Sequence, residues 1–438
     1  MAGRRVLRTA AVWLVIAGSA TTLAAGGGLD SSFAGGSGWL RTVEVRSPSN
    51  NYLPAGAEDL ALQADGKLLA VGKIIDGQSH WYFGVFRYTA EGALDGSFGA
   101  GGWAELDLGG ASFAHTVAVQ RDGRIVVAGE GNCDLSTCFT LVRFMPDGSV
   151  DRSFSGGVVR TRFATYGSSR AYDVAVQPDG KIVVVGMRYT GSDAADDEVF
   201  AVARYLPDGS LDRTFSGDGL ASVDFGYGDA DADVVAVQPN GRILVAGNGK
   251  RSGSWTAGDF AVARLLPDGR LDRSFSGDGR STVDFGRSET VYGLALQRDG
   301  RIVAAGSSGA LRAPPRISVM RLRADGRLDH SFGSHGKLLT RPGSNGGYAR
   351  AVVQQRDGRI LVGGRAFDDD RHDTSNWVLV RYRPTGGLDT SFGRGGLAVG
   401  DYSTGADWVG ALATQPDGRI VAAGEIGASL GLARYRPN

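Results

Sequence analysis

The sequence predicts an all-β fold, a seven-bladed β-propeller of four-stranded antiparallel blades. Three observations predict it: a phrase that recurs seven times, four short strand signals in each repeat, and a third strand that is apolar at successive positions. The first strand of the mature chain is expected to pair in the last blade and close the ring.

A recurring phrase divides the chain into seven units. Each unit carries Leu-Asp-x-x-Phe, then Gln-x-Asp-Gly-Lys/Arg-Ile and a glycine, then an arginine that precedes an aromatic residue or leucine and, most often, Pro-Asp-Gly. The glutamines that mark the units lie 57 to 61 residues apart, at Gln63, Gln120, Gln177, Gln238, Gln297, Gln355 and Gln415. Such a period indicates an array of equal supersecondary units.

Four strands are predicted in each unit, and the fourth unit shows them most clearly. They are residues 220–225 (strand a), 234–238 (b), 242–246 (c) and 260–265 (d). Asn240-Gly241, or Asp-Gly in other units, supplies the positive φ that a tight b–c hairpin requires. Strand c is apolar at successive positions, as in residues 182–186, so both of its faces must be covered.

A ring of blades packed face to face covers both faces of every unit and leaves only short sheet edges. A linear β-solenoid is the alternative, but its coils are usually much shorter and it needs atypical capping units, which neither end shows. The repeats start with the phrase at residues 29–33 and a strand candidate at 39–45, and they end with a strand d at 432–435. We therefore expect one propeller domain over residues 29–438, closed by the strand at 39–45.

Residues 1–25 are predicted to be a signal peptide. Arg4, Arg5 and Arg8 precede an apolar stretch of about 16 residues, with small residues near Ala24 and Ala25 at which a peptidase could cut. A membrane anchor is the alternative, but the stretch is shorter than the roughly 20 residues that span a bilayer. Arg4-Arg5 also leaves a twin-arginine export signal open. Because no sorting tail follows the last repeat, we expect a secreted or periplasmic bacterial protein with no membrane insertion after cleavage.

The composition suits an exported β protein. With 47 basic and 47 acidic residues, the formal net charge is zero, so no overall field attracts nucleic acid or anionic membranes. The sequence has no cofactor-binding loop, and no cofactor is expected. The two cysteines, Cys133 and Cys138, lie five residues apart in one predicted loop, where export favours a disulfide. A metal pair is the weaker interpretation, because two thiols alone make an incomplete site.

The phrases of the repeat resemble those of the delta-60 repeat family of bacterial secreted and surface proteins. They are carried by residues 211–219 (Leu-Asp-Arg-Thr-Phe-Ser-Gly-Asp-Gly), 177–182 (Gln-Pro-Asp-Gly-Lys-Ile) and 203–209 (Ala-Arg-Tyr-Leu-Pro-Asp-Gly). The resemblance covers about residues 29–438 and implies a propeller-like array of largely uncharacterised function. Departures are mild. Val150 replaces leucine in the third unit, Asn240 replaces aspartate, and Gly386 is taken to replace the aspartate before Gly387 in the seventh unit.

The recurring polar residues are interpreted as structural. An aspartate follows the leucine of each unit and an arginine ends each strand d, which predicts seven Asp–Arg or Asp–backbone ties. A catalytic site needs a unique set of groups, whereas a feature of every blade more naturally holds blades together. The recurring phenylalanine is expected to pack between blades, and the recurring glutamine to bond backbone near its own turn.

Function is therefore expected where the units differ. In an antiparallel blade the a–b and c–d connections emerge on one face, which we call the variable face, and the near-invariant b–c and d–a turns on the opposite turn face. The variable face carries Trp81, Trp377 and Trp408 beside acidic residues, which suits sugar binding by ring stacking and hydrogen bonds. Solvated loop tips and rings packed against neighbouring loops are the alternative. A cation held by Asp368, Asp370 and Asp373 is a weaker candidate.

The mouth of the central channel is a second candidate site. If strand b is innermost, the residues five before each glutamine converge there; they are Glu58, His115, Tyr172, Asp233, Tyr292, Arg350 and Gly410. A carboxylate, an imidazole and a guanidinium together could perform acid–base chemistry. They could equally be a polar plug that solvates the channel mouth.

Two functions of different classes follow. The first is a binding or scaffold module for an extracellular glycan or protein, expected to be a monomer. The alternative is a propeller enzyme, a polysaccharide hydrolase or lyase that uses Glu58, His115, Asp233 and Arg350. The absence of a nucleophile motif or metal-spaced histidines favours the binding module.

Overall fold

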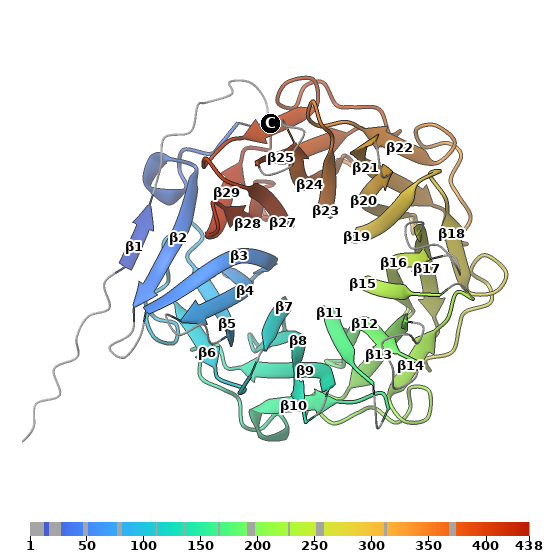
Figure 1. Cartoon of the computed structure of the whole chain (residues 1–438), viewed down its shortest axis with the longest axis horizontal. Coiled ribbons are helices and arrows are strands. Elements are labelled where there is room, and N and C mark those ends of the chain that lie inside the picture. Colours follow the sequence, from blue (N-terminus) through green and yellow to red (C-terminus); the bar gives the residue numbers. More distant parts are fainter. Residues whose placement is uncertain are drawn as a thin grey trace, which may run out of the picture.

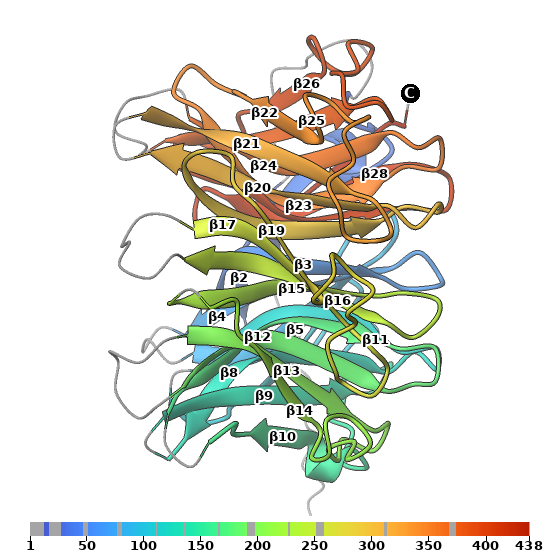
Figure 2. The same cartoon turned by 90° about the vertical axis from the view of Figure 1, so that its right-hand side faces the viewer.

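The chain forms a ring of seven β-sheet blades around a central channel (Figure 1). The computed structural model describes residues 13–16, 28–46, 51–76, 81–110, 112–134, 136–164, 167–190, 198–226, 228–250, 258–310, 313–367 and 374–437. The side view shows the strands of successive blades as stacked layers (Figure 2). The predicted fold class is confirmed.

Each blade contains four antiparallel strands, ordered below from the channel outward. Blade 1 is β3 (Asn51–Leu62), β4 (Leu68–Asp76), β5 (Trp81–Tyr88) and β6 (Trp103–Leu106); blade 2 is β7 (Phe113–Val119), β8 (Ile125–Cys133), β9 (Ser136–Phe144) and β10 (Val158–Thr161). Blade 3 is β11 (Ser169–Val176), β12 (Ile182–Tyr189), β13 (Glu198–Tyr205) and β14 (Leu220–Val223); blade 4 is β15 (Ala230–Val237), β16 (Ile243–Lys250), β17 (Gly258–Leu265) and β18 (Arg280–Val283). Blade 5 is β19 (Ser288–Leu296), β20 (Ile302–Ala310), β21 (Ala313–Leu322) and β22 (Lys337–Thr340); blade 6 is β23 (Gly347–Gln354), β24 (Ile360–Phe367), β25 (Ser375–Tyr382) and β26 (Leu397–Gly400). Blade 7 is β27 (Asp407–Thr414), β28 (Ile420–Ile426), β29 (Leu430–Tyr435) and, from the other end of the chain, β2 (Trp39–Arg46). Short 3-10 turns precede two of the outer strands, Ala34–Gly36 before β2 and Ser155–Gly157 before β10.

The ring closes as the sequence predicts. β2 pairs antiparallel with β29, with Trp39 opposite Ala433 and Thr42 opposite Leu430. Trp39 and Leu40 are buried in the blades that they join. The N-terminal strand therefore supplies the outer edge of the last blade.

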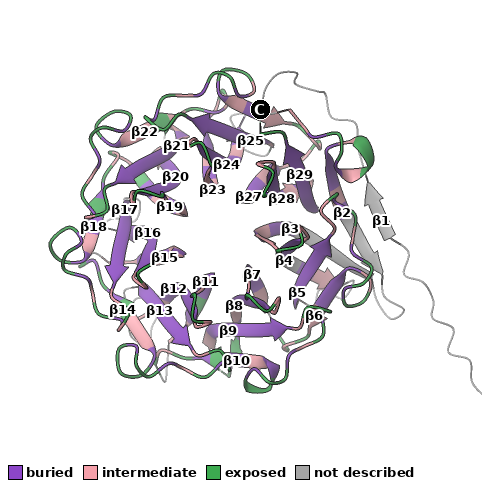
Figure 3. Ribbon diagram, turned by 180° about the vertical axis from the view of Figure 1, so that it is seen from behind, coloured by how far each residue is buried: buried purple, intermediate pink, exposed green. Residues whose placement is uncertain are grey.

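The hydrophobic core consists of seven clusters, one between each pair of neighbouring blades. Strand β12 shows why the third strand of the repeat is apolar throughout. Ile182 and Val184 pack toward blade 2, while Val183 and Val185 pack toward blade 4. Buried residues accordingly fill the strands of the blades, whereas exposed residues gather in the connections between strands (Figure 3).

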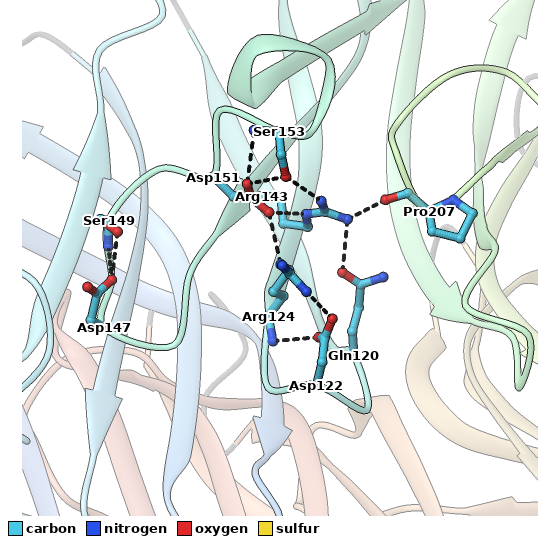
Figure 4. A network of polar contacts seen from close by, with 9 residues as sticks. All are labelled: Gln120, Asp122, Arg124, Arg143, Asp147, Ser149, Asp151, Ser153 and Pro207. Atoms are coloured by element: carbon cyan, nitrogen blue, oxygen red, sulfur yellow. Dashed lines mark hydrogen bonds and ion pairs between the residues drawn. The ribbon is translucent and has the colours of Figure 1, made fainter.

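The recurring aspartate and arginine form the predicted ties. In blade 2, Arg143 Nε donates to Asp151 at 2.8 Å, and its Nη1 donates to the carbonyl of Pro207 in blade 3 (Figure 4). Burial by itself would raise the pKa of Asp151, but hydrogen bonds from Ser153 and the charge of Arg143 outweigh it and lower the pKa. The arginine thus clamps its own blade to the next.

The same clamp recurs in every blade. The Arg–Asp pairs are Arg87–Asp95, Arg143–Asp151, Arg204–Asp212, Arg264–Asp272, Arg321–Asp329, Arg381–Asp389 and Arg434–Asp30. Each arginine also lies over the recurring phenylalanine of its unit, as Arg204 does at 4.6 Å from the ring centre of Phe215. The seventh pair joins the two ends of the repeat array, so the clamp and the strand closure act at the same place.

The glycine of Pro-Asp-Gly is required by the phenylalanine of the preceding blade. Gly209 has φ of +89°, and a Cβ on it would lie 2.9 Å from the ring of Phe154. Gly386, with φ of +99°, occupies this same position against Phe332. The alignment of Gly386 with the aspartate is therefore wrong, and Thr385 takes the place of the aspartate.

The recurring glutamine does not behave as predicted. Its Oε1 is buried without a hydrogen-bond partner within the described part of the chain at Gln63, Gln177, Gln238, Gln297, Gln355 and Gln415. In blade 2, Gln120 Oε1 accepts a bond of 3.3 Å from Arg143. The turn itself is closed by backbone, with Gln177 N–H donating to the Lys181 carbonyl.

The predicted disulfide is confirmed at the end of the β8–β9 hairpin, where the Cα atoms of Cys133 and Cys138 lie 5.9 Å apart. Within the predicted signal peptide, β1 (Trp13–Ile16) pairs with the outer edge of β2; cleavage of residues 1–25 stays a prediction. In the described ranges, no helix has the length and apolar character needed to cross a membrane.

Candidate functional site at the channel mouth

A β-bulge places one residue of each innermost strand at the channel mouth. In β11 the pairing with β12 skips from Ala171 to Asp173, so Tyr172 is the extra, unpaired residue. The same skip occurs at His115, Asp233, Tyr292, Arg350 and Gly410, and a wider one in β3 includes Glu58. Bulges commonly re-aim side chains beside functional sites.

The glycine of the repeat faces this bulge. A Cβ on Gly186 would lie 1.8 Å from the carbonyl oxygen of Arg170, which stands two residues before the bulged Tyr172. Only a residue without a side chain permits that approach. The recurring glycine of strand c therefore exists because the neighbouring inner strand is bulged.

All seven residues predicted at the mouth line one cavity of about 330 Å³. The residues that follow them in the chain line it as well, among them Asp59, Thr116 and Asp173. The volume is at the lower end of the range for small-ligand sites. Strand b is innermost, and its first residues lie toward the variable face.

Arg350 organises one side of the mouth. Its Nη1 donates to Glu58 Oε2 at 3.2 Å, and its guanidinium lies 4.5 Å from the ring centre of Trp408 and 5.6 Å from that of Tyr292. The Arg350 side chain stays 41% exposed. A charged planar group held between two rings and a carboxylate is oriented toward the opening.

An aromatic row occupies the other side. The ring centres of Trp81 and Phe113 lie 4.9 Å apart, those of Phe113 and His115 6.4 Å, and those of His115 and Tyr172 5.9 Å. All four side chains are partly exposed. The row runs from the β5 end of blade 1 across β7 to β11, so three blades supply one contact surface.

Deeper in the channel, two carboxyl groups meet at one hydroxyl. Thr116 Oγ1 lies 2.9 Å from Asp59 Oδ2 and 3.0 Å from Asp173 Oδ1. A hydroxyl has one proton to donate, so it cannot satisfy two ionised carboxylates. Burial, and then the charge of Asp59, raise the pKa of Asp173 to about 7. One proton shared across this trio fits both the geometry and the pKa.

Asp233 lies beside this trio. Its Oδ2 is buried and has no hydrogen-bond partner within the described residues. Burial and the neighbouring Asp231 raise its pKa well above the usual value, against the opposing charge of Arg350. The mouth therefore combines Asp233, whose surroundings favour its neutral form, with Glu58, whose side chain is paired with the guanidinium of Arg350.

The tryptophans of the variable face separate into two groups. Trp81 and Trp408 are partly exposed and border the mouth, as described above. Trp377 is fully buried between blades 6 and 7, with its ring centre 5.8 Å from that of Tyr402. Its prediction as an exposed ligand-binding ring is wrong, because the ring belongs to the core. The proposed cation ligands Asp368, Asp370 and Asp373 lie outside the described residues.

The sequence argument missed Asp59, Thr116 and Asp173. Strict alternation assigns the residue after each mouth position to the opposite face of the strand. The bulge breaks this alternation and turns two successive residues toward the channel. One signal was available, since Asp59 and Asp173 are acidic where the equivalent positions of other blades are Val234, Gly293, Ala351 and Ala411.

A family model described as "Domain of unknown function (DUF5122) beta-propeller" matches seven segments that together make up more than half of the chain. They are residues 63–98, 120–154, 177–215, 238–275, 297–332, 355–392 and 415–438. No curated protein matches the chain significantly.

Three solved structures illustrate what the chain resembles in fold. The WD40 β-propeller domain of Doa1 has a TM-score of 0.48 at 10% identity, covering 92% of this chain and 98% of its own. A protein of unknown function from Dyadobacter fermentans has a TM-score of 0.44 at 13% identity, with 76% and 96% covered. Sqt1 from Chaetomium thermophilum has a TM-score of 0.43 at 14% identity, with 88% and 97% covered.

Proposed function

Because the chain belongs to the DUF5122 β-propeller family, whose name leaves its function open, we propose a function from the channel mouth: an exported module that binds a glycan there. The observation that carries the proposal is a cavity that one bulged residue from every blade lines. Export follows from the predicted signal peptide, and the delta-60 resemblance points to the same kind of secreted protein.

The chemistry of the mouth fits a polyhydroxylated ligand. The partly exposed rings from Trp81 to Tyr172 offer faces for sugar rings, and Glu58, Asp233 and Arg350 offer acceptors and donors for hydroxyl groups. Binding would occur at the variable face, while the clamps of the turn face keep the blades rigid. A rigid scaffold reduces the entropy lost on binding.

A glycan array probed with the purified protein, followed by calorimetry on the best ligand, tests this proposal. We expect Tyr172→Ala and Glu58→Gln each to weaken binding by about tenfold or more, as for the loss of an aromatic or charged contact. The control is Arg152→Ala, an exposed side chain of the turn face, which should bind as the wild type does. If the protein binds proteins from the culture medium but no glycan, the proposed glycan ligand is wrong and the partner is a protein.

One observation favours a second candidate, a glycan-cleaving enzyme. Asp233, whose carboxyl pKa is raised by burial, and Glu58, which is paired with Arg350, line the same cavity, and catalysts of sugar cleavage use two carboxyl groups in different surroundings. His115 and Arg350 would position the substrate. Release of reducing ends from the bound glycan, abolished by Asp233→Asn while binding persists, would support the enzyme. If the glycan is bound and never cleaved, the result favours the binding module over the enzyme.

A further inference from the structure

A second cluster of carboxyl groups lies away from the channel, where blades 4 and 5 meet. Asp259 belongs to β17, Asp284 follows β18, and Glu289 is the second residue of β19. Each offers a carboxylate oxygen, and these oxygens lie within 4.8 Å of one another. Asp259 and Glu289 are buried, and Asp284 is exposed.

Glu289 is the group that needs an explanation. Its side chain is only 1% exposed, and its Oε1 accepts a bond of 2.7 Å from Arg287 N–H. Its Oε2 is buried without a hydrogen-bond partner in the described part of the chain. A buried carboxylate oxygen without a donor costs folding free energy. Burial, and then the charges of Asp284 and Asp259, raise the pKa of Glu289 to about 7.

The equivalent position of blade 7 shows how the fold can satisfy such a group. Asp407 stands, like Glu289, three residues before the mouth residue of its strand, and it is equally buried. Its carboxylate accepts from the backbone N–H groups of Tyr402, Ser403 and Gly427 and from the Ser403 hydroxyl. Both oxygens of Asp407 therefore have donors, whereas Glu289 has the carboxyl groups of Asp259 and Asp284 close by.

We propose that Asp259, Asp284 and Glu289 form a Ca²⁺ site that fastens blade 4 to blade 5 at the variable face. An all-oxygen carboxylate set suits a hard divalent cation. Ca²⁺ accepts about six to eight oxygen ligands in flexible geometry, whereas Mg²⁺ demands a near-ideal octahedron, so three carboxylates from separate segments favour Ca²⁺. The exposed side of Asp284 leaves room for the water ligands that complete the coordination of Ca²⁺. The ammonium of Lys337 donates a hydrogen bond to the backbone carbonyl of Asp284 and lies 5.3 Å from the ring centre of Phe285.

Calorimetric titration of the full chain, stripped with a chelator, with CaCl2 tests the site. We expect one saturable event per chain and a melting temperature that rises with Ca²⁺ concentration. Glu289→Gln keeps the size of the side chain, and Asp284→Asn changes an exposed residue; each should weaken Ca²⁺ binding at least tenfold. Near-ultraviolet circular dichroism checks that both variants fold. If Glu289→Gln does not fold, Asp284→Asn alone tests the site.

The matched control is Asp224→Asn. Asp224 occupies the place of Asp284 one blade earlier and caps Gly226 N–H just as Asp284 caps Gly286 N–H. This variant loses the same turn contact, so its Ca²⁺ affinity should equal that of the wild type. The proposal is overturned if the wild type shows neither heat nor a thermal shift, if both site variants bind Ca²⁺ normally, or if Mg²⁺ binds as tightly as Ca²⁺.

Discussion

At the scale of single residues, the roles in this chain divide by whether a residue recurs. The recurring aspartate, arginine and phenylalanine meet in one clamp per blade, and their contacts repeat with nearly the same geometry from blade to blade. The residues that do not recur, among them Glu58, Asp173 and Arg350, line the channel. Repetition therefore marks structural residues, and variation marks candidate binding residues.

The carboxyl pair of the channel should make stability depend on pH. The pKa of Asp173 rises from 3.8 in the unfolded chain to about 7 in the folded protein, so the folded state binds the extra proton between these values. This contribution to stability is complete below pH 4 and is lost as the pH rises through 7. Asp173→Asn removes it, so the fall in unfolding free energy between pH 5 and pH 8 should shrink by about 1–3 kcal/mol.

Urea denaturation at pH 5 and pH 8 measures this difference. The exposed turn residue Asp179 provides the control, since Asp179→Asn should keep the wild-type change with pH. Equal changes in the wild type and Asp173→Asn would show that no proton is shared between Asp59 and Asp173.

At the scale of elements, the bulged inner strand is the feature that links architecture to the site. It requires a glycine in the adjacent strand, and it turns two successive residues toward the channel. The outer strands contain only four residues in blades 1 to 6, because they need to cover only the rim. The differences among blades at the channel mouth are therefore carried by the innermost strands.

Gly186→Ala tests the bulge. The new Cβ would meet the Arg170 carbonyl at 1.8 Å, and backbone cannot move aside as a flexible side chain would. We expect a loss of about 3 kcal/mol in the free energy of unfolding, measured by denaturant titration. Gly96→Ala is the matched control, since a Cβ there meets nothing within 4 Å, and it should change stability by less than about 0.5 kcal/mol. A similar loss in both variants would mean that the close approach in blade 3 is unimportant.

At the scale of the whole molecule, the ring depends on joining the two ends of the repeat array. β2 completes blade 7, and Arg434 of β29 pairs with Asp30 and donates to the carbonyl of Ala90 in blade 1. Each blade is held by its two neighbours. Loss of the junction between β2 and β29 therefore opens the ring.

A chain that starts at Ser47 should therefore differ from one that starts at Gly26. The shorter chain lacks β2 and the buried side chains of Phe33, Trp39 and Leu40, a loss of at least about 5 kcal/mol. Hydrogen exchange should show loss of protection in β29 and then in β28, while the chain from Gly26 keeps both protected. Equal protection of blade 7 in the two chains would contradict closure by β2.

The sequence by itself determined the number of blades, the four strands of each, the strand that closes the ring and the structural role of the Asp–Arg phrase. These properties are periodic, so seven copies of the same local pattern all indicate one answer. The disulfide was also predictable, because its cysteines are neighbours in a hairpin.

Only the tertiary structure decided how the non-repeating residues meet. Asp59, Thr116 and Asp173 come from three blades and stand 57 residues apart, and a bulge that alternation does not foresee brings them together. Trp377 resembled an exposed ring until a neighbouring blade covered it. Asp259, Asp284 and Glu289 likewise meet only across a blade junction. Packing between blades depends on the curvature of the ring, which no local pattern encodes.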